Sequence, residues 1–247
     1  MTSNSNNGVG TDEAANTIDI VYEFAFPDGR QDDFQVTLDA DTFEPVTSRP
    51  GPLPHWTKLD FQQCPNCPLS VDDHPYCPLA ANLTLIEPST AWVSHQEVEV
   101  CISTSQRTSI RTTTTQRAIG ALMGLLIAVS DCPHALFLRP MARYHLPLAT
   151  GEETVIRSVS FYLMKQYFVA QAGGNPDWNL EGLIAAYKEI AKVNMHMGKR
   201  LRAVSEQDTI INALTELDLF AKNVPFAIED ALEDVKYVFE VTQPTPS

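Results

Sequence analysis

Four cysteines of this chain are each followed directly by proline, and this repeated pair is the clearest chemical feature of the sequence. The pairs are Cys64-Pro65, Cys67-Pro68, Cys77-Pro78 and Cys132-Pro133. Proline fixes φ, removes a backbone N–H and disfavours helix at the preceding residue, so each sulfur is expected on a rigid turn. Thiolates on rigid turns suit a tetrahedral metal ion or an iron–sulfur cluster. The sequence therefore predicts a metal site with these four cysteines as ligands.

The spacing of the first two cysteines supports chelation. Two residues separate Cys64 from Cys67, so both thiols can face one ion from a single turn. A thioredoxin-like redox pair is disfavoured, because there the second cysteine sits in a helix and Pro68 cannot continue one. The choice between zinc and an iron–sulfur cluster stays open. Also open are a site without metal, transient haem binding through a thiolate, and replacement of one cysteine by His74 or His134.

A second group of reactive side chains follows the fourth cysteine. His145 could act as a general acid or base near neutral pH. Arginine forks match the geometry of carboxylates and phosphates, so a small anionic ligand is expected at Arg139, Arg143 and Arg157. The structural alternative is a buried loop whose arginines bond backbone carbonyls and the carboxylates of Glu152 and Glu153. No serine-protease spacing, phosphate-binding glycine motif or zinc-protease motif accompanies this group.

Charge and composition limit the class of protein. The chain has 247 residues and a formal net charge of −14, which argues against binding to bulk nucleic acid or to anionic membranes. The charge is uneven, since residues 107–157 carry six arginines and no lysine against three acids. No apolar run approaches the ~20 residues of a membrane span, and the start lacks the pattern of a signal peptide. A cytoplasmic location is expected, where reduced thiols favour metal ligation over disulfides.

The spacing of apolar residues predicts the strands and helices that position these residues. Alternation predicts one hairpin within 18–38 and a second within 97–114. From Thr115 onward the period is 3.6, and helices are predicted at 116–129, 152–172, 177–204, 208–223 and 227–239. Cys101 has no proline after it and is expected in the core of the second hairpin, beside Val100 and Ile102.

The predicted fold class is α+β, with a small N-terminal antiparallel β portion joined to a C-terminal bundle of about five helices. We expect a disordered tail over 1–16, a β-rich portion with the cysteine segment over 17–114, the bundle over 115–240 and a disordered tail over 241–247. Cys132 belongs to the bundle and the other three predicted ligands to the β-rich portion. A shared metal would therefore staple the two portions together.

Four stretches together resemble an uncharacterised bacterial family, a domain of unknown function: Gln63–Leu69, Cys77–Leu83, Cys132-Pro133 and Arg139–Pro147. The resemblance extends from about Ile20 to Asp218. It implies that the stretches form one site, and it attaches no activity to that site. The residues themselves favour a non-catalytic metal-binding module or sensor with an anionic ligand or a protein partner. The alternatives are a metal- or cluster-dependent enzyme acting on a small anionic substrate and a helical scaffold subunit.

Overall fold

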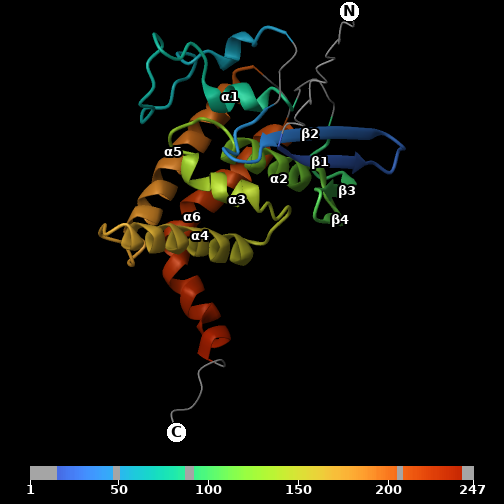
Figure 1. Ribbon diagram of the computed structural model, residues 1–247. Helices are drawn as coiled ribbons and strands as arrows, with labels where there is room; N and C mark the ends of the chain where they lie inside the picture. Colours follow the sequence, from blue (N-terminus) through green and yellow to red (C-terminus); the bar gives the residue numbers. More distant parts are fainter. Residues whose placement is uncertain (1–15, 47–50, 87–91, 205–207, 241–247) are drawn as a thin grey trace, which may run out of the picture.

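Two antiparallel hairpins pair side by side to form one four-stranded sheet. The computed structural model describes residues 16–46, 51–86, 92–204 and 208–240, so almost all of the two predicted tails lies outside it (Figure 1). The strands are β1 (Thr17–Ala25), β2 (Gln31–Asp39), β3 (Glu97–Ser103) and β4 (Thr108–Thr114). Their order is β2-β1-β3-β4, and every neighbouring pair is antiparallel. Both predicted hairpins are confirmed.

The sheet buries one face, as the alternation requires. Ile20, Tyr22 and Phe24 of β1 and Val100 of β3 are buried, while the residues between them are exposed or partly exposed. Successive side chains of a strand point to opposite faces, so the apolar set falls on one side. At the tip of the first hairpin Gly29 has a φ of 85°, which glycine adopts without steric strain.

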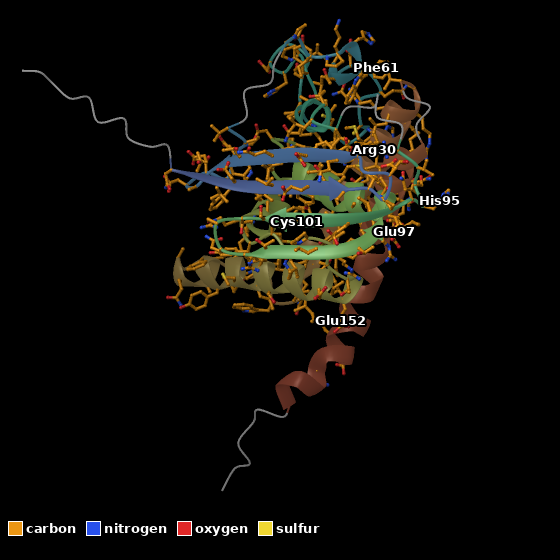
Figure 2. All side chains as sticks on the ribbon, turned by 90° about the vertical axis from the view of Figure 1, so that its right-hand side faces the viewer. Arg30, Phe61, His95, Glu97, Cys101 and Glu152 are labelled. Carbon is orange, nitrogen blue, oxygen red and sulfur yellow. The ribbon has the colours of Figure 1, made fainter. Side chains whose placement is uncertain are left out.

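Cys101 lies on the outer face of β3, and the prediction that it belongs to the core was wrong. Val100 and Ile102 are buried, whereas Cys101 is only partly buried. It pairs across the sheet with Glu23 and with Ile110, whose exposure is 65%. A residue between two inward-facing neighbours must face outward, because the side-chain period of a strand is two. Figure 2 labels Cys101 on this strand.

Helices make up most of the remainder of the described chain. They are α1 (Pro78–Leu83), α2 (Thr115–Ala128), α3 (Arg139–Arg143), α4 (Gly151–Gln171), α5 (Glu181–Arg202) and α6 (Asp208–Glu240), with short 3-10 helices at His55–Thr57 and Leu136–Leu138. The first three predicted long helices correspond to α2, α4 and α5. None of the helices in the described ranges is both long and apolar enough to cross a membrane.

The two helices predicted at 208–223 and 227–239 are instead one continuous helix, α6. The prediction ended a helix before Pro225, because proline removes one hydrogen bond of the ladder and clashes with the preceding turn. Such a defect bends a long helix without ending it when the rest of the helix is well packed. α6 packs against α2, α4 and α5. The α+β fold class is confirmed.

α2 lies at the centre of the molecule, between the sheet and α6. It contacts β3 and β4 on one side and α6 on the other. Small residues permit the close approach: a Cβ on Gly120 would lie 3.9 Å from Ala213, and one on Gly124 would lie 3.8 Å from Leu217. Buried side chains of the sheet, α1 and the long helices form one continuous hydrophobic cluster. The β portion and the helices thus share a core.

Candidate thiolate site

Three of the predicted ligands lie in the connector between β2 and α1, drawn in blue and teal in Figure 1. The N–H of Cys67 donates to the carbonyl of Cys64 at 3.0 Å, which closes the turn between the two thiols. Cys77 is the N-cap residue of α1, and Pro78 occupies the first turn, where no N–H is needed. The N–H of Cys77 donates to the carbonyl of Thr57 at 2.7 Å. Each proline therefore lies beside a fixed turn or helix start.

The fourth predicted ligand lies in the loop that follows α2. Cys132 is buried, and its carbonyl accepts the N–H of Ala135 at 2.8 Å. Burial raises the pKa of the Cys132 thiol to about 11, and the backbone N–H of His134, which bonds to the sulfur, opposes that rise. Backbone N–H donors to sulfur stabilise a thiolate, the form that binds metals.

The four predicted ligands come together in one region. Burial raises the pKa of the Cys64 thiol to about 12, and the nearby Cys77, Cys132 and Cys67 raise it further. Cys77 and Cys67 likewise raise the pKa of Cys132. Because charges in proteins interact appreciably only within about 10 Å, the four thiols occupy one region of the fold although they come from separate segments.

The arrangement is not itself a coordination sphere. In the part of the chain that the structure describes, no three His, Cys, Asp or Glu side chains are grouped closely enough to hold an ion as they stand. All five cysteines are free thiols. Binding of one metal ion would require the four sulfurs to move closer together. Each of them is now buried or half-buried against the hydrophobic core.

A chain of hydrogen bonds fixes the first turn against the fourth ligand's loop. His134 Nε2 donates to the carbonyl of Asn66, between the first two cysteines, at 2.6 Å. The side-chain amide of Asn66 donates to Glu189 of α5, at 2.8 Å to Oε2 and 3.2 Å to the carbonyl. The turn, the loop and α5 are thereby tied together. His134 has one ring nitrogen engaged, while His74 is exposed.

Arg200 of α5 is the residue that sequence reasoning missed. Its side chain is only 1% exposed. It donates to three backbone carbonyls of the connector, those of Trp56 and Lys58 at 2.6 Å and that of Leu59 at 3.4 Å. The signal was its position three residues after the buried Met197, on the apolar stripe of α5. A charged residue on such a stripe needs partners inside the protein.

Most of the groups that act on the charge of Arg200 are thiols. Burial lowers the pKa of its guanidinium, and the neighbouring Cys77, Cys64 and Cys67, followed by Asp60, act in the opposite direction. Within the described ranges, the ion pairs that form do not include Arg200. The guanidinium therefore lies beside three of the four predicted ligands, and it is hydrogen-bonded to the connector without forming an ion pair among those of the described residues.

The arginines predicted to bind an anion are distributed over three environments. Arg139 pairs with Asp131 at 2.7 Å and with Glu44 at 3.6 Å. Arg143 lies over two aromatic rings, at 5.8 Å from Phe43 and 5.4 Å from Tyr144. Arg157 donates to the carbonyls of Met141 and Tyr144, both at 2.9 Å. These bonds resemble the structural alternative, with Asp131 and Glu44 in place of Glu152 and Glu153. Anion binding by the three arginines stays a prediction.

His145 is enclosed between the sheet and the helices. Its Nε2 shares a hydrogen bond of 2.5 Å with the hydroxyl of Tyr22. Burial, followed by the charge of Arg157, lowers the pKa of His145 to about 3. The imidazole is neutral near pH 7, and one of its ring nitrogens is engaged by Tyr22. A general acid or base role for His145 stays a prediction.

Comparison with known proteins gives one match. A family model described as a domain of unknown function (DUF6901) matches residues 20–240, which include the sheet, the cysteine segment and the helices. No curated protein and no solved structure matches. The matched range agrees with the resemblance to an uncharacterised family, and it carries no statement about metal or activity.

Proposed function

We propose that this chain, which belongs to the family described as a domain of unknown function (DUF6901), is a metal-binding module with a four-thiolate centre. Cys64, Cys67, Cys77 and Cys132 would hold one zinc ion or one iron–sulfur cluster. The observation that carries the proposal is that the four cysteines lie within electrostatic range of one another and that three of them, Cys64, Cys67 and Cys77, lie beside the buried guanidinium of Arg200.

The charge balance of the site supports a thiolate centre. Burial of a guanidinium is costly, and the three carbonyls that Arg200 binds, together with the charge of Asp60, offset that cost only in part. Four thiolates around a divalent ion leave a net charge of about −2, which would offset the charge of Arg200. Neutral thiols supply no such charge. The buried arginine is therefore better accounted for by a loaded site than by four protonated cysteines.

The donor set supports a closed, non-hydrolytic centre. A zinc ion with four thiolates has no open position for water or substrate, and such sites stabilise folds. The ligands come from the connector and from the loop after α2, and Arg200 joins the same connector to α5. A bound centre would thus clamp the connector onto the helices. With an iron–sulfur cluster, the same clamp would respond to redox conditions. Either centre suits a reducing compartment such as the cytoplasm.

Metal analysis of anaerobically purified protein tests the proposal. We expect close to stoichiometric zinc in a colourless sample, or iron with labile sulfide and a broad visible absorption band. Cys64→Ser and Cys132→Ser are each expected to lower the metal content several-fold, because removal of one ligand opens the sphere.

Cys101→Ser is the matched control, since it makes the same chemical change on the outer face of the sheet. It should retain the wild-type metal content. Full metal content in both Cys64→Ser and Cys132→Ser would refute the ligand assignment. Failure of the wild type to take up either zinc or a reconstituted cluster would refute the proposal itself.

A further inference from the structure

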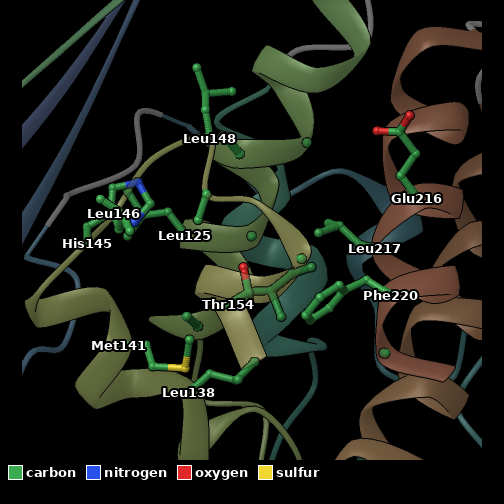
Figure 3. Close-up of a pocket in the computed structure, with 18 of the residues that line it drawn as sticks. Leu125, Leu138, Met141, His145, Leu146, Leu148, Thr154, Glu216, Leu217 and Phe220 are labelled. Atoms are coloured by element: carbon green, nitrogen blue, oxygen red, sulfur yellow. The ribbon is translucent and has the colours of Figure 1, made fainter. Parts of the chain in front are cut away.

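A second site lies away from the cysteines, in a cavity that no proposal above uses. The cavity has a volume of about 640 Å³ and is enclosed by α2, α3, α4, α5, α6 and the end of β4. Small-molecule sites commonly have volumes in this range. Figure 3 shows Leu217 and Phe220 extending from α6 toward Leu125 and Leu138 on the opposite wall. The interior is thus largely hydrocarbon.

The charged residues of the cavity are mostly positive. Three arginines line it, Arg111, Arg117 and Arg157, against one acid, Glu216. The whole chain carries a net charge of −14, so this balance is the reverse of the protein average. The carboxylate of Glu216 already accepts a hydrogen bond from the Gln116 amide at 2.5 Å. The lining therefore selects for a negative group.

The three arginines of the cavity can still bind a negative group of a ligand. Arg111 donates to the carbonyl of Leu148 at 3.2 Å, and Arg157 donates to two carbonyls as described above. Among the ion pairs of the described residues, none includes Arg111, Arg117 or Arg157. Glu153, whose charge interacts with those of Arg111 and Arg157, has its carboxylate bonded to the N–H of Thr150 at 2.7 Å.

The position of the arginines sets the orientation of a ligand. Arg111 and Arg117 line the cavity and are also exposed, so they mark its opening to solvent. The leucine and phenylalanine side chains lie further inside. An apolar body would lie among the side chains of α2, α4 and α6, and an acidic head would remain at the opening, where a guanidinium fork can bind it.

We propose that this cavity binds an apolar organic acid, with its hydrocarbon body among Leu125, Leu138, Leu217 and Phe220 and its carboxylate at Arg111 and Arg117. The assignment rests on the combination of a hydrocarbon interior with a cationic opening in an acidic protein. It does not depend on the metal content of the thiolate site, which lies on other segments.

Calorimetric titration of the full chain, as purified, tests the proposal with three amphiphiles of equal chain length. Dodecanoate, dodecanol and dodecyltrimethylammonium are each used below the concentration at which they form micelles. We expect dodecanoate to bind in the micromolar range, dodecanol to bind about tenfold more weakly, and the cation not to bind. Arg117→Glu is expected to weaken dodecanoate binding about tenfold or more, because it reverses a charge at the opening.

Arg107→Glu is the matched control, since it reverses an exposed arginine that does not line the cavity. It should leave the affinity unchanged. Thr154→Phe should weaken dodecanoate and dodecanol alike, because Thr154 faces the cavity and a ring would fill it (Figure 3). If Thr154→Phe does not fold, the surface variants still decide. The proposal is overturned if dodecanoate does not bind, if dodecanol binds equally well, or if Arg117→Glu and Arg111→Glu both bind dodecanoate as tightly as the wild type.

Discussion

Replacement of Arg200 by methionine is expected to lower the free energy of unfolding by about 3 kcal/mol or more, because a buried carbonyl that loses its donor costs about 1–3 kcal/mol and three carbonyls are affected. Methionine keeps much of the side-chain volume, so the loss is not a cavity effect. It leaves the carbonyls of Trp56, Lys58 and Leu59 without their donor inside the protein. Urea denaturation followed by circular dichroism measures the change.

Arg202→Met is the matched control, because Arg202 is exposed two residues further along the same helix. It should change the stability by well under 1 kcal/mol. Arg200→Lys should recover only part of the loss, since an ammonium cannot reproduce the planar fork that reaches two sides of the connector. Wild-type stability in Arg200→Met would show that the connector does not depend on this guanidinium.

A double-mutant cycle separates the two roles of Arg200. If the guanidinium only ties down the connector, the effects of Arg200→Met and Cys64→Ser should add. In the alternative case, the guanidinium is coupled to a loaded thiolate centre, whose charge it offsets. The free energy of unfolding of the double variant should then fall by less than the sum of the two single-variant losses. The difference should be about 1 kcal/mol or more, because each change removes part of the same interaction. Metal content is measured on the wild type, both single variants and the double variant. Additive effects in protein without metal would not show that Arg200 and the loaded centre are independent.

Local patterns were sufficient for the strands and for most helix positions. Alternation in β1 and the Pro27-Asp28-Gly29 turn specify a hairpin without reference to the rest of the chain. The start of α4 is equally local: Thr150 and Glu153 form a reciprocal capping box within one turn. Such signals are short-range hydrogen bonds and side-chain periods, which a sequence displays directly.

The predictions for Cys101 and Pro225 were wrong because a local sequence rule allowed two structures. Cys101 lies among apolar neighbours in the sequence, yet the parity of β3 turns it outward between Val100 and Ile102. Pro225 disfavours helix by its chemistry, yet α6 continues through it from Asp208 to Glu240 as one helix. For Cys101 the deciding factor was tertiary, namely the face that the sheet buries; for Pro225 the local rule predicts a break where the helix continues.

The sites divide in the same way. Residue type and the prolines singled out the cysteines, but no local pattern relates Arg200 to the Trp56 carbonyl, 144 residues earlier. Tyr22 and His145 meet across 123 residues and could not be paired from the sequence. The cavity near Leu217 is likewise a product of helix packing. The reactive residues could therefore be predicted from their types in the sequence. The residues that surround them could be identified only from the structure.

The partly buried His145, whose imidazole is desolvated in the folded protein, is expected to make the fold sensitive to mild acid. Its pKa is about 3 in the folded protein, mainly because of burial, and about 6.5 in an unfolded chain. Between these values the unfolded state binds the proton and the folded state does not, so stability falls as the pH drops below about 6.5. The loss should reach about 2 kcal/mol at pH 5. Urea denaturation from pH 7.5 to pH 5 measures the slope.

Other titratable groups change the stability in a different pH range or by a smaller amount. The carboxylates with lowered pKa values, such as Glu189 and Asp177, lose their contribution mainly below about pH 4. His196 also has a lowered pKa, through partial burial and Lys199, and shifts the stability in the same direction. The range from pH 7.5 to pH 5 therefore reports chiefly on His145.

His145→Gln isolates the effect, because glutamine is neutral throughout and its amide can either accept from or donate to the hydroxyl of Tyr22. The variant should be somewhat less stable at pH 7.5 and should lose most of the slope toward pH 5. His74→Gln, at an exposed position, should keep the wild-type slope. Metal content is recorded at each pH, since acid also protonates thiolate ligands, a change that both variants share with the wild type. An unchanged slope in His145→Gln would show that acid acts on the fold through another group.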